Sequence, residues 1–80
     1  MFYTYILKSE AKGTYYYGST ENIEKRIGEH NAGKVRYTKS KRPWIIHYVE
    51  TFPSRSEALK REKFFKTIDG YLHLKKCKII

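Results

Sequence analysis

The chain has 80 residues and a formal net charge of +9, from 17 lysines and arginines against eight acidic residues. Its length predicts a single domain over residues 1–80 with one thin core. Its one cysteine excludes an internal disulfide, and its three histidines argue against a Cys/His zinc cluster. It has no apolar run of about 20 residues and no signal-peptide pattern at its start, so we expect a cytoplasmic protein.

The positive charge, together with 16% aromatic residues, indicates a nucleic-acid partner. An anionic membrane is the rival partner for a basic chain. Binding to a membrane surface would require a basic amphipathic helix with an exposed apolar face. The apolar stripes in this sequence are instead consistent with a core, so we expect nucleic acid and no membrane.

Three segments have the composition of strands. The segment "FYTYILK" at residues 2–8 is rich in aromatic and β-branched residues, and "TYYYGS" at 14–19 follows it after the polar turn "SEAKG". So short a connection predicts an antiparallel hairpin. The segment "WIIHYVET" at 44–51 is also strand-like, and we expect it to join the hairpin. The result is a three-stranded antiparallel sheet.

A first helix is predicted after the hairpin, with Thr20 as a possible N-cap and a stop at 31–33. Both of its isoleucines lie on one face. At 100° per residue, Arg26 and His30 fall within about 60° of that face. Two polar side chains should therefore point inward.

A second helix should begin at Ser54, which has capping-box spacing to Glu57, and run to about residue 68. Glu62 lies within its apolar stripe. A buried carboxylate needs an ion pair, with Arg26 or another basic residue, or a bound cation. The stripe consists of Ala58, Leu59, Phe64, Phe65 and Ile68.

A last short helix is predicted in "DGYLHLKK". The fold class is then α/β, of the α+β type, with helices flanking the sheet. Period-2 alternation makes Tyr5 and Tyr16 candidate cross-strand neighbours. Gly18, inside a strand, indicates a bulge or a close backbone approach, which suits a substrate phosphate or a packed helix start. The other tyrosines of the hairpin are expected to serve packing: Tyr3, Tyr15 and Tyr17.

Four motifs in order resemble those of the GIY-YIG nuclease superfamily: "YTY", "YYG", "ENIEKRIGEHN" and "SEALKREKFFK". The small size is similar to that of the stand-alone bacterial members and of the UvrC N-terminal domain. The sequence departs from the motifs at three points. Tyr3 and Thr4 replace the Gly and Ile of the first motif, and Ser19 replaces a lysine of the UvrC-type nucleases. The asparagine that some members place after the glutamate helix is also not evident.

The resemblance implies a metal-dependent endonuclease that hydrolyses phosphodiester bonds in DNA, in repair or recombination. Glu62 would hold Mg²⁺ or Mn²⁺. Tyr5 would be the general base, oriented by Tyr16, with its pKa lowered by the positive charge of Arg26. Arg26 would also clamp phosphate oxygens. His30 would either contact the nucleophile or Tyr5, or satisfy a core neighbour.

The segment "KVRYTKSKR" at 34–42 has five cations and no acidic residue, which suits binding of several phosphates. Tyr37 could stack on a base. The alternative is a solvated loop that serves solubility. No base-reading helix is apparent, so the chain should recognise backbone or structure. The expected nucleic-acid-binding residues are Gly18, Lys34, Arg36, Tyr37, Lys39, Lys41 and Arg42.

Two other functions stay open at the level of the sequence. The altered first motif is compatible with a nucleic-acid-binding module that has lost catalysis. The same residues could also survive only as structure in a basic interaction or scaffold domain. Nicking of DNA with Mg²⁺ would favour the nuclease, whereas salt-dependent binding without nicking would favour the binding module.

Overall fold

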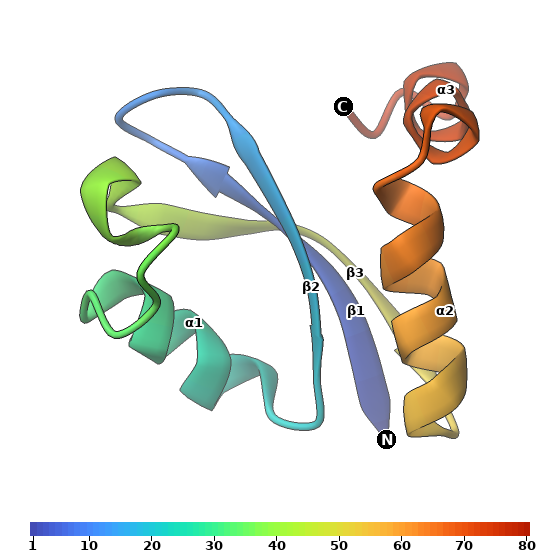
Figure 1. The fold of residues 1–80 in the computed structure, drawn as a ribbon, viewed down its shortest axis with the longest axis horizontal. Coiled ribbons are helices and arrows are strands. Elements are labelled where there is room, and N and C mark those ends of the chain that lie inside the picture. Colours follow the sequence, from blue (N-terminus) through green and yellow to red (C-terminus); the bar gives the residue numbers. More distant parts are fainter.

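An antiparallel sheet of three strands lies at the centre of the computed structural model, which describes residues 1–80. The strands are β1 (Phe2–Ser9), β2 (Tyr15–Thr20) and β3 (Trp44–Phe52), in the order β2-β1-β3 (Figure 1). The predicted hairpin and the predicted third strand are confirmed. β2 pairs only with β1, so the outer edge of β2 is open.

Three α-helices and one short 3-10 helix flank this sheet. None of them is long and apolar enough to cross a membrane. The helices are α1 (Ile23–Asn31), α2 (Arg55–Phe65), α3 (Ile68–Lys76) and the 3-10 helix η1 (Lys39–Lys41).

The helix starts follow local hydrogen bonding. The prediction that Thr20 caps α1 is wrong, because the cap is Asn22, whose side chain accepts from the N–H of Lys25 at 3.1 Å. The Thr20 hydroxyl instead accepts from the backbone N–H of Asn22. The predicted cap of α2 is confirmed, since the Ser54 hydroxyl accepts from the N–H of Glu57 at 3.3 Å.

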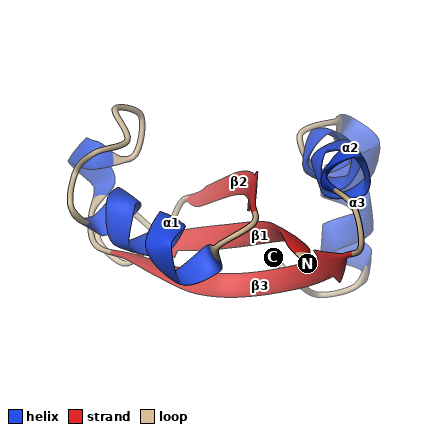
Figure 2. Cartoon of the chain, turned by 90° about the horizontal axis from the view of Figure 1, so that it is seen from below, coloured by secondary structure: helices blue, strands red, loops and turns tan.

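β1 is covered on both faces, and its alternation divides the core in two. Tyr5 and Leu7 pack with Trp44 on the face that α1 covers. Ile6, between them in sequence, packs on the opposite face with Phe65 of α2 and Leu74 of α3. In Figure 1, α1 lies to the left of the sheet and α2 and α3 to the right, and Figure 2 shows the same separation from below.

The second helix is shorter than predicted. It ends at Phe65, and Thr67 caps α3 by accepting from the N–H of Gly70 at 3.0 Å. This break takes Ile68 out of the predicted apolar stripe, and its side chain is 79% exposed. Leu59 is also exposed, whereas Ala58 and Phe65 are buried as predicted.

Replacement of Gly70 by alanine is expected to destabilise the fold. Gly70 is buried where α3 crosses the end of α2, and a Cβ there would collide with the backbone carbonyl of Phe64. Backbone cannot yield as a flexible side chain can, so we expect a loss of about 1 to 3 kcal/mol in the free energy of unfolding, measured by urea denaturation.

Gly28 provides the matched control for this substitution. It lies exposed in α1, and a Cβ added there would meet no atom within 4 Å. Gly28→Ala should therefore raise stability by about 0.5 to 1 kcal/mol through helix propensity. Equal effects of the two substitutions would contradict the packing assigned to Gly70.

Candidate active site

The side chain of Tyr5 lies across Gly18 on the face of the sheet that α1 covers. Gly18 is the direct partner of Tyr5 in the β1/β2 pairing, while Tyr16 is paired with Leu7. The prediction that Tyr5 and Tyr16 are cross-strand neighbours is confirmed, although the two residues are not direct partners. The two rings are diagonal neighbours on the same face, with centroids 6.5 Å apart.

Packing of the Tyr5 side chain explains why position 18 is a glycine. A Cβ at this position would collide with the hydroxyl of Tyr5. The residue is buried, so the expected contact with a nucleic-acid phosphate finds no open surface here. The close approach that the sequence indicated is made by a tyrosine of the same sheet.

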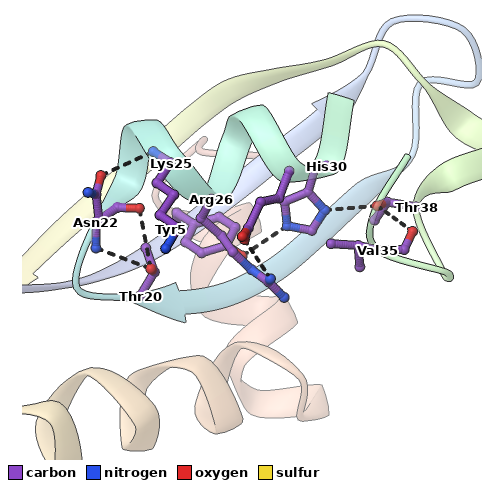
Figure 3. A network of polar contacts seen from close by, with 9 residues as sticks. Tyr5, Thr20, Asn22, Lys25, Arg26, His30, Val35 and Thr38 are labelled. Carbon is purple, nitrogen blue, oxygen red and sulfur yellow. Dashed lines mark hydrogen bonds and ion pairs between the residues drawn. The ribbon is translucent and has the colours of Figure 1, made fainter. Parts of the chain in front are cut away.

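Tyr5, His30 and Thr38 form a buried chain of hydrogen bonds (Figure 3). The Thr38 hydroxyl donates to the carbonyl of Val35 at 3.3 Å, so it must accept from Nδ1 of His30 at 2.8 Å. Nε2 of His30 is then free to accept from the Tyr5 hydroxyl at 3.1 Å. With the Thr38 hydroxyl donating to Val35, the network favours the tautomer of His30 that is protonated at Nδ1, and Tyr5 then donates to Nε2.

Burial sets the protonation states of Tyr5 and His30 in this hydrogen-bonded network. Desolvation raises the pKa of Tyr5 to about 12, although the neighbouring Arg26 acts in the opposite direction. Desolvation also lowers the pKa of His30 to about 4, and the charge of Arg26 contributes. The expectation that Arg26 brings the pKa of Tyr5 below its usual value is therefore wrong. Both groups are neutral at pH 7.

Arg26 lies between the Tyr5–His30–Thr38 network and a polar pocket. Its guanidinium donates to Glu29 at 3.0 Å, and this side chain is partly exposed. The pocket beside it has a volume of about 390 Å³ and no hydrophobic lining residue. It lies between the end of β2, the start of α1 and the start of α2, and is lined by Ser19, Thr20, Glu21, Asn22, Lys25, Arg26, Glu29 and Arg55.

Glu62 is held by Ser19 and Lys66, and not by Arg26. The Ser19 hydroxyl donates to Oε1 of Glu62 at 2.7 Å, and Nζ of Lys66 donates to Oε2 at 2.7 Å. The Glu62 side chain is 16% exposed and close enough to Tyr5 for its charge to contribute to the raised pKa of Tyr5. Ser19 also lines the polar pocket, which places Glu62 at its border.

The donor set around Glu62 fits a hydrated metal ion. No group of three or more histidine, cysteine, aspartate or glutamate side chains is present, so the chain offers no site that would enclose a metal fully. Mg²⁺ is commonly bound by one or two carboxylates while it keeps waters and takes phosphate oxygens. Ser19 occupies only one lone pair of its carboxylate oxygen, and Lys66 is half exposed and can move away.

The basic segment at 34–42 is anchored beside the site by its one buried residue. Thr38 binds His30, and its carbonyl accepts from Nε1 of Trp44 at 2.9 Å. The ring of Tyr37 lies 5.9 Å from that of Tyr16. None of the five cations of the segment forms an ion pair. They are Lys34, Arg36, Lys39, Lys41 and Arg42.

The structure brings most of the predicted site residues to one region and adds others. Tyr5, Tyr16, Arg26 and His30 lie on the α1 face, and Glu62 reaches the same region from α2 through Ser19. Sequence reasoning missed the contacts that position these groups. No local pattern marks these contacts. Ser19 and Glu62 are 43 residues apart in the sequence, and Arg55 and Glu21, which meet across the pocket, are 34 apart. Thr38 and His30 are eight residues apart but belong to different elements.

Comparison with known proteins assigns this architecture to a family. Residues 1–69 match the GIY-YIG catalytic domain. The chain therefore belongs to the GIY-YIG family, a family of nucleases.

Its relatives include small proteins of similar length. It is 46% identical over 74 residues to a UPF0213 protein of Staphylococcus haemolyticus, covering 91% of this chain and 89% of the relative. It is 38% identical over 69 residues to a UPF0213 protein of Halobacterium salinarum, covering 85% and 88%. The solution structure of a UPF0213 protein from Bacillus halodurans has a TM-score of 0.57 and 32% identity, over 98% of this chain and 86% of that one.

The pKa of His30 predicts how stability depends on pH. The unfolded chain binds a proton at His30 below about pH 6.5, whereas the folded chain does so only near pH 4. Stability should therefore fall as the pH drops through this window. We expect the free energy of unfolding to be about 2 kcal/mol lower at pH 5 than at pH 7.

His30→Gln separates this effect from the titration of carboxylates. The variant keeps a polar side chain but cannot take up the proton, so its stability should vary less between pH 5 and pH 7. Urea denaturation at both pH values measures the difference. A wild-type stability that is flat over this range would contradict the assigned protonation of His30.

Proposed function

We propose that this chain is a metal-dependent endonuclease that hydrolyses phosphodiester bonds in DNA, in repair or recombination. One observation carries the proposal. In a member of a nuclease family, Arg26 and Ser19 line one polar pocket; Arg26 also approaches the buried Tyr5, and Ser19 binds Glu62. The pocket is lined by both acidic and basic side chains and by no apolar one, which suits a charged, hydrated substrate.

The cations of the pocket would bind the phosphate that is cleaved. Lys25, Arg26 and Arg55 line it, and the last two are paired with acidic partners at 3.0 and 3.4 Å. These ion pairs are exposed enough to exchange for phosphate oxygens at small cost. Arg26 adds a planar fork that can donate two hydrogen bonds as negative charge develops.

Glu62 would hold the divalent ion, either Mg²⁺ or Mn²⁺, at the border of this pocket. When bound, such an ion acts as a Lewis acid on the phosphate and lowers the pKa of a coordinated water. Ser19 would keep the carboxylate in place through its hydrogen bond to Oε1. Lys66 would give up Oε2, to which it donates in this structure.

Tyr5 and His30 would accept the proton of the attacking water. The Tyr5 hydroxyl donates to Nε2 of His30 and accepts from Arg26, so its oxygen keeps one lone pair that could accept from a water. As this oxygen takes the proton of the water, its own proton would pass to Nε2. This transfer avoids a free phenolate, which the raised pKa of Tyr5 disfavours, but it places the proton on His30, whose pKa is lowered to about 4 in the free protein; the negative charge of a bound phosphate would raise that pKa. Thr38 would hold the resulting imidazolium through Nδ1.

The basic segment at 34–42 would bind the flanking phosphates, because its five cations have no acidic partner. Such contacts position a strand without reading its sequence. We therefore infer recognition of the backbone or of a branched structure.

Glu62→Gln is the variant that tests catalysis. It keeps the size of the side chain and an oxygen for Ser19 but removes the charge that would hold the metal. We expect nicking of supercoiled plasmid with Mg²⁺ or Mn²⁺ to fall by about 100-fold or more, while DNA binding and the unfolding midpoint change little.

Glu10→Gln is the matched control, because Glu10 is exposed in the turn after β1 and makes no ion pair. It removes the same charge and should nick as the wild type does. Wild-type protein that binds DNA with a steep salt dependence but never nicks it would be a binding module instead. Absence of binding at low salt would favour a scaffold.

A further inference from the structure

A second hollow runs along the open edge of β2, distinct from the polar pocket. Its volume is about 450 Å³, and four of its five lining residues are tyrosines. The β2 rings in this hollow are partly exposed and that of Tyr37 is exposed, so solvent reaches them. We call this hollow the tyrosine groove; it is lined by Tyr15, Tyr16, Tyr17, Tyr37 and Lys66.

Two lining residues of the tyrosine groove, Tyr16 and Lys66, contact residues of the candidate active site. The ring of Tyr16 lies 4.9 Å from the imidazole of His30 and 5.9 Å from the ring of Tyr37. At its other end the groove reaches Lys66, whose ammonium binds Glu62. A ligand seated in the groove would thus have the proton acceptors on one side and the proposed metal ligand on the other.

Tyr37 presents its ring to solvent at the border of the groove. It is 64% exposed and keeps its position between Tyr16 and the ammonium of Lys41, which lies 4.7 Å from the ring centroid. Its segment is anchored by the buried Thr38. An exposed aromatic ring that is held in place offers a flat surface at little entropic cost.

The charge around the groove selects an anionic ligand. Lys66 lines the groove, and the ammonium of Lys41, which has no acidic partner, lies 4.7 Å from the ring centroid of Tyr37. Flat apolar surfaces bordered by cations match a nucleotide, because a base stacks on aromatic rings while its phosphate binds ammonium groups. A peptide strand could pair with the open edge of β2 but would not use both the ring faces and the free cations.

We propose that the tyrosine groove binds an unpaired base of the strand that is cut, next to the phosphate in the polar pocket. The binding part rests on the groove alone, and its link to cleavage rests on the proposed function. A base inside a duplex has both faces covered by its neighbours, so Tyr37 can stack on an unpaired base or at a duplex end but not within a continuous duplex. The substrate class is then DNA with a single-stranded segment, such as a flap, a gap or a branch.

The test measures binding without cleavage, in EDTA, by fluorescence anisotropy. The probes are a labelled single strand of twelve thymidines, an abasic strand of the same length and a duplex. Wild-type protein should bind the thymidine strand more tightly than the abasic strand. Tyr37→Ala should weaken binding of the thymidine strand by about 5- to 100-fold and leave the abasic strand unchanged, because stacking but no phosphate contact is lost.

Two further variants make the result specific. Tyr37→Phe keeps the ring and should bind as the wild type does. Tyr71→Ala removes a tyrosine that is 48% exposed on α3, outside the groove, and should also have no effect. Melting curves of all variants check that each is folded.

The proposal is overturned if Tyr37→Ala binds the thymidine strand as the wild type does, or if it weakens both strands equally. It is also overturned if the wild type prefers the duplex or the abasic strand. Failure of the proposed function looks different: the base-dependent binding would remain, while plasmid incubated with Mg²⁺ would stay intact.

Discussion

The hydrogen bond from the Tyr5 hydroxyl to His30 holds together the parts of the chain that make the site. Tyr5 belongs to β1, His30 to α1, and Thr38, on the other side of the imidazole, to the segment at 34–42. To make this bond, the Tyr5 ring crosses β2 at Gly18. Any residue with a Cβ at position 18 would collide with the tyrosine hydroxyl, so this position requires a glycine. This buried hydrogen bond therefore links β1, where it crosses Gly18 of β2, to α1 and, through Thr38, to the basic segment.

Successive side chains of β1 point to opposite faces of the sheet. One face carries the candidate site, and the other carries much of the packing that stabilises the fold. Tyr5 faces α1 and the polar chain, whereas Thr4 and Ile6 face α2 and α3. The Thr4 hydroxyl donates to the carbonyl of Ala58 at 2.6 Å and so fixes α2 against the strand. Glu62 lies one turn further along the same helix. Through this contact the packing face also determines where the carboxylate reaches the edge of β2.

The sequence predicted those elements whose structure depends on periodicity and helix capping. It did not predict the contacts between segments that are distant in the chain. Strand composition predicted the three strands and the hairpin, and the helical face predicted that His30 points inward. The sequence could not reveal that α2 ends at Phe65. The break between α2 and α3 depends on how Gly70 fits against the end of α2. Nor could it reveal the direction of the pKa shift of Tyr5, since desolvation depends on the tertiary packing around the ring.

The charges of the site differ in how firmly they are held. Both oxygens of Glu62 have partners, but the bond from Lys66 is a partly exposed contact between residues four apart on one helix, a type that contributes only about 0.3 to 0.5 kcal/mol. The divalent ion proposed for Glu62 would displace such a partner at small cost. Lys66, once released, remains at the border of the tyrosine groove with its charge free for a phosphate. Metal binding at Glu62 and strand binding in the groove would then favour one another, because each frees the group that the other uses.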